Sequence, residues 1–197
     1  MFRTSRFFKQ FCVFFGNNSR LFLFLALILC GVGVGCFASS SLPATASPLL
    51  ELITPRLPEQ LRFLPVLTAF FQNSLVTLTA IGLLMLFGMS LYGLPAVAVL
   101  PFSYGVALGL GEMAVVRSLG AVGLLLTLPG TLVAVWAVLI ACAEALKLTL
   151  RLIAQVMPSP SKSGLWRDFR LFFLRFMLCF LLGILGSAIQ TTTAVFL

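Results

Sequence analysis

The chain has no histidine and very few charged residues. Of its 197 residues, 9% are Asp, Glu, Lys or Arg, whereas soluble domains carry about a quarter. Without histidine, the commonest general base and the commonest metal ligand are missing, and no Ser–His or Cys–His pair can form. Asp168 is the one aspartate, so an aspartyl dyad is excluded as well. The sequence therefore predicts a protein that is not an enzyme and holds no cofactor and no metal.

The cysteine spacing and the charge pattern exclude further classes. The five cysteines include no CxxC pair, so we interpret them as small apolar residues rather than as disulfides or metal ligands. A net charge of +8 in a soluble protein would suggest nucleic acid binding. Here the charges are confined to short segments between apolar runs. We therefore expect them to set membrane topology, with no nucleic acid partner.

Long apolar runs make up most of the chain. A hydrocarbon core about 30 Å thick needs roughly 20 helical residues to cross it, and the uncharged run 64–111 is long enough for two crossings. The sequence predicts an all-α fold, a polytopic membrane helix bundle with about five transmembrane helices. We place the spans at about 21–38, 70–92, 95–116, 119–146 and 173–197.

Proline and glycine divide these runs. Gly93-Leu94-Pro95 separates the second span from the third, because glycine ends a helix well and proline suits a first turn. We expect Gly93 to adopt a backbone conformation that is costly for other residues. Pro101 weakens the third span, and Pro129-Gly130 interrupts the fourth, which predicts a kink or two half-helices. Backbone groups freed in a membrane need partners, so the third span is expected to be buried among other helices.

Residues 1–20 form a basic segment of their own. Most of its phenylalanines fall on one helical face, which predicts an amphipathic helix in the headgroup layer; the other interpretation is a basic flank that only orients the first span. Gly16-Asn17-Asn18 is expected to break this segment, with Ser19 capping the next helix. A signal peptide is a further alternative, but the small-residue pair at 44–46 lies well past the apolar run. We therefore expect 21–197 to form one five-span membrane domain.

Basic residues set the expected orientation. Four positive charges precede the first span and six lie between the fourth and fifth, whereas the charges of the 39–65 loop cancel. The sequence predicts a multi-pass protein of the cell membrane. Its N-terminus is expected to be cytoplasmic and its C-terminus extracytoplasmic.

Small residues mark helix faces suited to close packing. Gly31 and Gly35 in the first span, and Gly105 and Gly109 in the third, are four apart, so each pair leaves a flat strip on its helix. A stripe of alanines at 134, 137 and 141 does the same in the fourth span. We expect the strip at Gly105 and Gly109 to press against another helix of this chain or of a partner, which leaves a homo-oligomer open. The alternative is that these two glycines only loosen the helix beside Pro101.

Two glutamates lie near the predicted spans. Glu112 and Arg117 are expected in a short outside turn, and Glu144 precedes Lys147 by three residues, the spacing of a helix-surface ion pair. An ionisable residue within a membrane is a functional candidate by default. Because both glutamates have a basic neighbour, we interpret them as helix-end pairs or snorkelling side chains.

The middle of the chain carries a recognisable series of motifs: an Asn near the start of the second span, a Gly-x-Ser-x-x-Gly-Leu-Pro turn, glycines four apart in the third span, and a Leu-Pro step in the fourth. These are Asn73; Gly88, Ser90, Gly93, Leu94 and Pro95; Gly105 and Gly109; and Leu128-Pro129. In these motifs and in the order of its spans, the chain resembles the stage II sporulation protein M family, best over about 70–130. It departs from the family pattern in the outside loop and in a last span that ends in Gln190 and three threonines without an acid.

The resemblance implies a non-enzymatic scaffold of the engulfment machinery of endospore-forming bacteria. In that machinery, membrane-anchored cell-wall hydrolases remodel peptidoglycan, and the scaffold recruits or anchors them at the membrane. Membrane lipids are the other expected partners. The alternative is a permease-like membrane subunit of unknown substrate, because broken helices such as those expected at Pro101 and Pro129 occur at transport sites. The lack of charge at mid-membrane argues against proton or cation coupling in such a permease.

Overall fold

The computed structural model describes residues 3–41, 63–90, 93–156 and 165–195. These ranges form four helices in the order α1 (Arg3–Ser41), α3 (Phe63–Gly88), α4 (Gly93–Val156) and α5 (Leu165–Val195), and contain no strand. All four are long and apolar enough to cross a membrane. The predicted all-α membrane bundle is therefore confirmed, with four helices rather than five.

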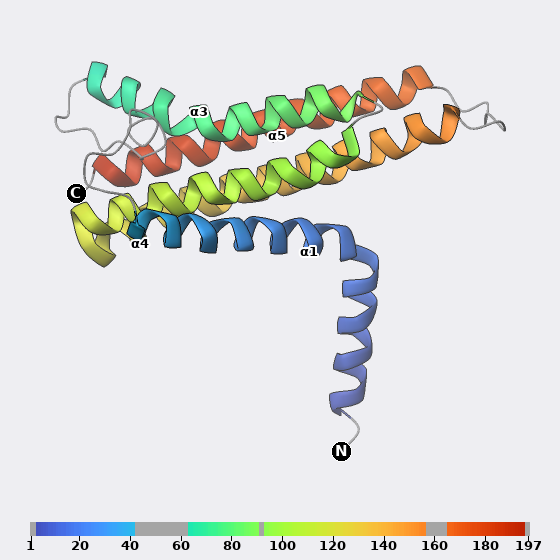
Figure 1. The fold of residues 1–197 in the computed structure, drawn as a ribbon, viewed down its shortest axis with the longest axis horizontal. Coiled ribbons are helices and arrows are strands. Elements are labelled where there is room, and N and C mark those ends of the chain that lie inside the picture. The colour runs from blue at the N-terminus through green and yellow to red at the C-terminus, as the bar shows by residue number, and fades with distance from the viewer. Residues whose placement is uncertain (1–2, 42–62, 91–92, 157–164, 196–197) are drawn as a thin grey trace.

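The difference in helix number comes from Gly120. The 64 residues of α4 would extend about 96 Å if straight, about three times the hydrocarbon core, but Gly120 has non-helical torsion angles (φ 69°, ψ −159°). The chain folds back there, as Figure 1 shows. We call residues 93–119 the first limb and residues 121–156 the second limb. These limbs contain the third and fourth predicted spans, and the reversal lies at Gly120 rather than between 116 and 119.

The two prolines inside α4 do not interrupt it. Pro101 and Pro129 are inside α4, and Gly120 is its one residue with non-helical torsion angles. The half-helices expected at Pro129-Gly130 are therefore not separate elements. Pro101 is almost fully buried and Pro129 lies at the exposed surface, so of these two prolines only Pro101 is surrounded by other helices.

Helix α4 is the centre of the bundle. It packs against α1, α3 and α5, and α3 also packs against α5 (Figure 1). The core between them combines small residues of the second limb, including Ala137 and Ala141, with large ones such as Ile28, Leu84 and Phe176. Large apolar side chains are exposed on the outer faces of every helix, as expected for a surface that lipid covers. The alanine stripe predicted in the fourth span therefore lies in the core.

Helix α1 continues through the segment expected to break it. It runs without interruption from Arg3 to Ser41, so Ser19 does not begin a new helix. The part that can span a membrane is Ser19–Ser41, and Figure 1 shows the N-terminal part of α1 turning sharply away from the bundle. The expectations for most of the 39–65 loop and for the centre of the loop between α4 and α5 fall outside the described residues.

Candidate functional site

The two glycine pairs predicted from the sequence contact each other. Gly31 and Gly35 of α1 lie against the first-limb backbone at Phe102 and Val106, and Gly105 and Gly109 lie against the α1 backbone at Ile28 and Val32. A Cβ atom on any of the four would overlap a backbone carbonyl oxygen of the facing helix. The contact is thus reciprocal, and only glycine permits it. The predicted close packing of the third span is confirmed, with α1 as its partner.

A second close contact joins the second limb to α5. A Cβ on Gly130 would lie 2.6 Å from the carbonyl oxygen of Gly186, and a Cβ on Gly186 would lie 2.9 Å from that of Gly130. In lipid there is little hydrophobic drive between helices, so such close packing must supply much of the attraction. Glycine contacts therefore join the first limb of α4 to α1 and the second limb to α5.

The Gly-x-Ser-x-x-Gly-Leu-Pro motif forms the tight connection between α3 and α4. The amide of Ser90 donates to the carbonyl of Phe87 at 2.9 Å, and the amide of Gly93 donates to the carbonyl of Ser90 at 3.1 Å. The buried hydroxyl of Thr149 donates to the carbonyl of Gly88 at 3.1 Å. The end of α3 is therefore bonded to the second limb where the connection begins.

The reason for glycine at position 93 differs from the expected one. Among the described residues only Gly120 has a positive φ, so the expectation of an unusual backbone conformation at Gly93 was wrong. A Cβ at Gly93 would instead overlap the carbonyl oxygen of Phe87 and lie 2.7 Å from the hydroxyl oxygen of Thr149. Gly93 is required by close packing, while Leu94 and Pro95 next to it are exposed.

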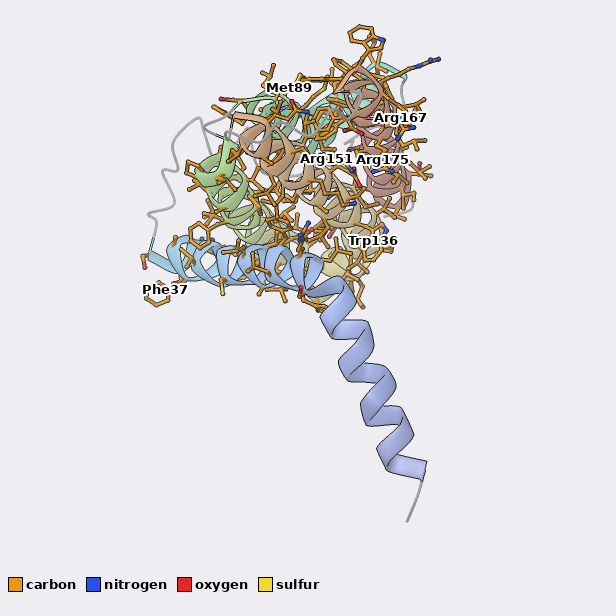
Figure 2. The ribbon with its side chains drawn as sticks, turned by 90° about the vertical axis from the view of Figure 1, so that its right-hand side faces the viewer. Phe37, Met89, Trp136, Arg151, Arg167 and Arg175 are labelled. Carbon is orange, nitrogen blue, oxygen red and sulfur yellow. The ribbon has the colours of Figure 1, made fainter. Side chains whose placement is uncertain are left out.

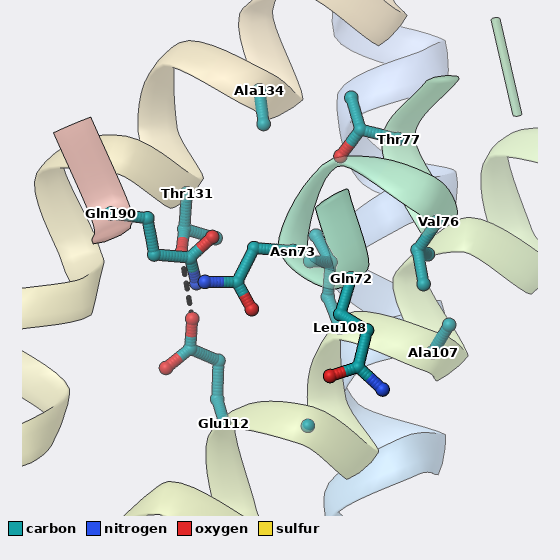
Figure 3. Close-up of a pocket in the computed structure, with 11 residues that line it drawn as sticks. Gln72, Asn73, Val76, Thr77, Ala107, Leu108, Glu112, Thr131, Ala134 and Gln190 are labelled. Carbon is teal, nitrogen blue, oxygen red and sulfur yellow. Dashed lines mark hydrogen bonds between the residues drawn. The ribbon is translucent and has the colours of Figure 1, made fainter. Parts of the chain in front are cut away.

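The most unusual chemistry in the bundle is a group of polar side chains at the end near Gly120. We call it the polar cluster; it consists of Gln72, Asn73, Glu112, Thr131 and Gln190, which Figure 3 shows, together with Thr127. The carboxylate of Glu112 accepts hydrogen bonds of 2.7 Å from the hydroxyls of both Thr127 and Thr131. Each oxygen of Glu112 thus has a donor, and both donors come from the second limb.

Helices α3 and α5 complete the polar cluster. The amide of Asn73 donates to the hydroxyl of Thr191 at 3.2 Å, and the hydroxyl of Thr193 donates to the carbonyl of Leu126 at 2.8 Å. The Oε1 atom of Gln72 is buried and has no hydrogen-bond partner among the described residues. These two hydrogen bonds join α3 to α5 and α5 to the second limb beside the polar cluster, and the cluster retains one unused acceptor.

A small cavity lies within the polar cluster. Its volume is about 30 Å³, enough for one or two water molecules, whereas pockets for small molecules span about 300–1,000 Å³. No group of three or more His, Cys, Asp or Glu side chains that could hold a metal ion occurs in the described part of the chain. The arrangement can orient water and hold helices in register.

Of the family-motif residues, Asn73 alone lies in the polar cluster. Gly88, Ser90 and Gly93 lie at the α3–α4 connection, Gly105 and Gly109 lie against α1, and Pro129 is exposed. The motif residues therefore serve separate contacts rather than one site.

Glu112 was misinterpreted from the sequence. Its partners are threonine hydroxyls, while the guanidinium of Arg117 donates to the carbonyl of Ser39 of α1 at 2.6 Å. The expectation that these two residues form a helix-end pair was therefore wrong. The expected Glu144–Lys147 pair is confirmed at 2.7 Å, and Glu144 also pairs with Arg175 of α5 at 2.6 Å.

Four apolar helices, close glycine contacts and an internal polar cluster define a multi-pass α-helical membrane protein. Among known families, the model described as stage II sporulation protein M matches residues 21–193. The chain belongs to this family. No curated protein and no solved structure matches it.

Proposed function

We propose that the protein is a non-enzymatic membrane scaffold of the sporulation engulfment machinery, which anchors peptidoglycan-remodelling partners at the extracytoplasmic surface. Membership of the stage II sporulation protein M family supports this role. The observation that carries the proposal is that polar side chains inside the bundle form hydrogen bonds to other parts of the bundle. Glu112 bonds to the other limb of α4, Asn73 bonds to α5, and Thr193 of α5 bonds to the second limb, as expected of residues that hold helical segments in a fixed arrangement.

The small size of the internal cavity favours a scaffold over the permease-like alternative. The cavity at the polar cluster, about 30 Å³, is far smaller than a site for a small solute. The permease-like alternative rested on broken helices at Pro101 and Pro129, and the helical torsion angles there speak against it. The absence of histidine from the whole chain supports a protein without catalytic activity of its own.

The charges support the proposed orientation. The described residues Arg20, Lys147, Arg151, Arg167 and Arg175 lie in parts of α1, α4 and α5 that meet at one end of the bundle, and Gly120 lies at the other (Figure 1). By the positive-inside rule the first end faces the cytoplasm. The polar cluster and the end of α5 then lie towards the extracytoplasmic side, where peptidoglycan is remodelled.

Affinity capture tests the proposal. The tagged full-length chain is solubilised from membranes of endospore-forming cells during engulfment, and the captured proteins are assayed for peptidoglycan cleavage on a zymogram. The scaffold proposal expects a cleaving partner with the wild-type chain and none with an unrelated tagged membrane protein. Peptidoglycan cleavage by the purified chain alone, or capture without any cell-wall hydrolase, would contradict it.

A further inference from the structure

A charged pocket lies between the second limb and α5, at the end of the bundle opposite the polar cluster. We call it the basic pocket; its volume is about 170 Å³ and its charged residues are Glu144, Lys147, Arg151, Arg167, Asp168 and Arg175. Figure 2, which looks at this end, shows Arg151, Arg167 and Arg175 grouped together. Four cations against two carboxylates leave a surplus of two positive charges.

Helical spacing explains how the basic pocket forms. Positions 144, 147, 148 and 151 fall on one face of the second limb, and positions 168, 171, 172 and 175 fall on one face of α5. Two interhelical ion pairs join these faces: Glu144 to Arg175 and Asp168 to Arg151, each at 2.6 Å. The residues of each pair are seven positions from those of the other, about 10 Å along each helix. The ion pairs therefore bracket a gap, and the buried side chains of Leu148 and Phe172 line it.

The acidic side chains of the basic pocket are more deeply buried than the basic ones. The carboxylate side chains are 12% and 16% exposed, whereas the side chains of Lys147, Arg151 and Arg175 are between 47% and 59% exposed. The acids thus lie inside and hold the cations in place, and the cations point their free donors outward. An anion that approaches the pocket meets guanidinium and ammonium groups first.

Arg167 is the cation without a carboxylate partner. It is exposed, lines the basic pocket, and makes no hydrogen bond or ion pair with any described residue. A guanidinium has five donors in a planar fork that matches a phosphate group. An unpaired guanidinium beside three cations that are already held in ion pairs is unfavourable for folding. The same arrangement suits the binding of an anion.

The surroundings of the basic pocket match a lipid surface. Trp166, next to Arg167, is 84% exposed, and tryptophan is enriched at the headgroup level of membranes. Leu171, Leu174 and Leu178 continue along α5 with about half of each side chain exposed, so apolar surface extends from the pocket towards the bilayer interior. Basic pockets between helices on the cytoplasmic side bind anionic headgroups in other membrane proteins.

We propose that the basic pocket binds the phosphate group of an anionic ligand at the membrane surface, with Arg167 as its free donor. Two kinds of ligand present such a phosphate group: an anionic phospholipid, through its headgroup, and a soluble phosphate ester. The exposed leucines beside the pocket favour the lipid.

Lipid retention by the purified full-length protein tests the proposal. The detergent-solubilised protein is titrated with phosphatidylglycerol, with phosphatidylcholine and with glycerol 3-phosphate, and bound ligand is counted by native mass spectrometry. The variant is Arg167→Gln, which removes no contact within the described protein. The matched control is Arg170→Gln, because Arg170 is exposed on the same helix and does not line the pocket.

We expect phosphatidylglycerol to bind in preference to phosphatidylcholine. Arg167→Gln should weaken its binding about fivefold, the effect of one basic residue near an anionic surface, and Arg170→Gln should change it less than about twofold. If glycerol 3-phosphate binds as tightly and with the same dependence on Arg167, the phosphate site stands and its ligand is soluble. Equal retention of both lipids, or equal effects of the two variants, would overturn the proposal.

Discussion

The hydroxyl of Thr131 donates a hydrogen bond of 2.7 Å to the carboxylate of Glu112, which lies on the other limb of α4. Thr127 donates a second bond of the same length to the other oxygen. A hydrogen bond to a charged group contributes about 1.5–3 kcal/mol, and a polar group left without its partner costs a comparable amount. The two threonines are therefore the principal support for an acid inside the bundle.

We predict that Thr127→Val/Thr131→Val destabilises the protein by about 2–4 kcal/mol, because both donors to Glu112 are lost while side-chain volume is kept. Thermal unfolding of the detergent-solubilised protein would measure the loss. Thr192→Val is the matched control, since Thr192 is exposed and its hydroxyl bonds only to its own helix at Ala188.

A double-mutant cycle identifies the acceptor responsible. In a Glu112→Gln background the two valines should cost about half as much, because a neutral amide loses less than a carboxylate when its donors are removed. An unchanged cost in that background would show that the threonines act through their own helix and not through Glu112.

Gly120 gives a prediction about backbone strain alone. Its torsion angles, φ 69° and ψ −159°, lie in a region that is almost restricted to glycine, and a Cβ atom there would meet nothing within 4 Å. Gly120→Ala should therefore cost about 1–3 kcal/mol, seen as a lower unfolding temperature. Ser118→Ala, two residues earlier and also exposed, is the control and should have little effect. A stable Gly120→Ala variant would show that this connection tolerates another conformation.

The sequence predicted the helices and the glycine strips suited to close packing, because both depend on composition and local spacing. Apolar runs of the required length define spans wherever they occur, and glycines four apart define a flat strip on any helix. The helix facing Gly105 and Gly109 was left open, and the structure identifies it as α1, at Gly31 and Gly35.

The partners of Glu112 could not be predicted in the same way, because they depend on where α4 reverses. In an antiparallel hairpin, residues equally far from the turn lie opposite each other. A turn between 116 and 119 would place Glu112 near position 123, whereas the turn at Gly120 places it near Thr127 and Thr131. A shift of five residues is not a whole number of helical turns, so it also brings a different face opposite Glu112. Arg117 likewise finds its partner, Ser39, on a helix distant in sequence.

A close-packing requirement at Gly93 predicts that any side chain there disrupts the α3–α4 connection. Gly93→Val would drive carbon atoms into Phe87 and Thr149, and we expect a marked loss of monodisperse protein in gel filtration. Gly82→Val is the control, because the nearest atom to a Cβ at Gly82 is the ring tip of Phe180 at 4.0 Å. If Gly93→Val folds as well as Gly82→Val, the motif serves a contact with another molecule.

The orientation of the bundle predicts the location of reporter fusions. Fusions after Arg20 and Lys162 should report a cytoplasmic location, and fusions after Pro48 and Leu197 an extracytoplasmic one, because the basic ends of α1, α4 and α5 are retained inside. Paired alkaline phosphatase and fluorescent protein reporters distinguish the two sides. A cytoplasmic C-terminus would contradict both the proposed orientation and the position of the polar cluster near the outer surface.

The glycine contact between α1 and the first limb gives the last prediction. Gly105→Leu/Gly109→Leu places side chains on the carbonyls of Ile28 and Val32, so α1 must move away and lose its close packing. Overpacking of this kind costs about 1–3 kcal/mol per site, and we expect a clear drop in unfolding temperature. Gly31→Leu should act in the same direction, since its side chain would meet the facing carbonyl of Phe102. Gly33→Leu is the matched control on α1, because a Cβ there meets nothing within 4 Å. Wild-type stability in Gly105→Leu/Gly109→Leu, or an equal loss in Gly31→Leu and Gly33→Leu, would show that these glycines loosen their helices rather than join them.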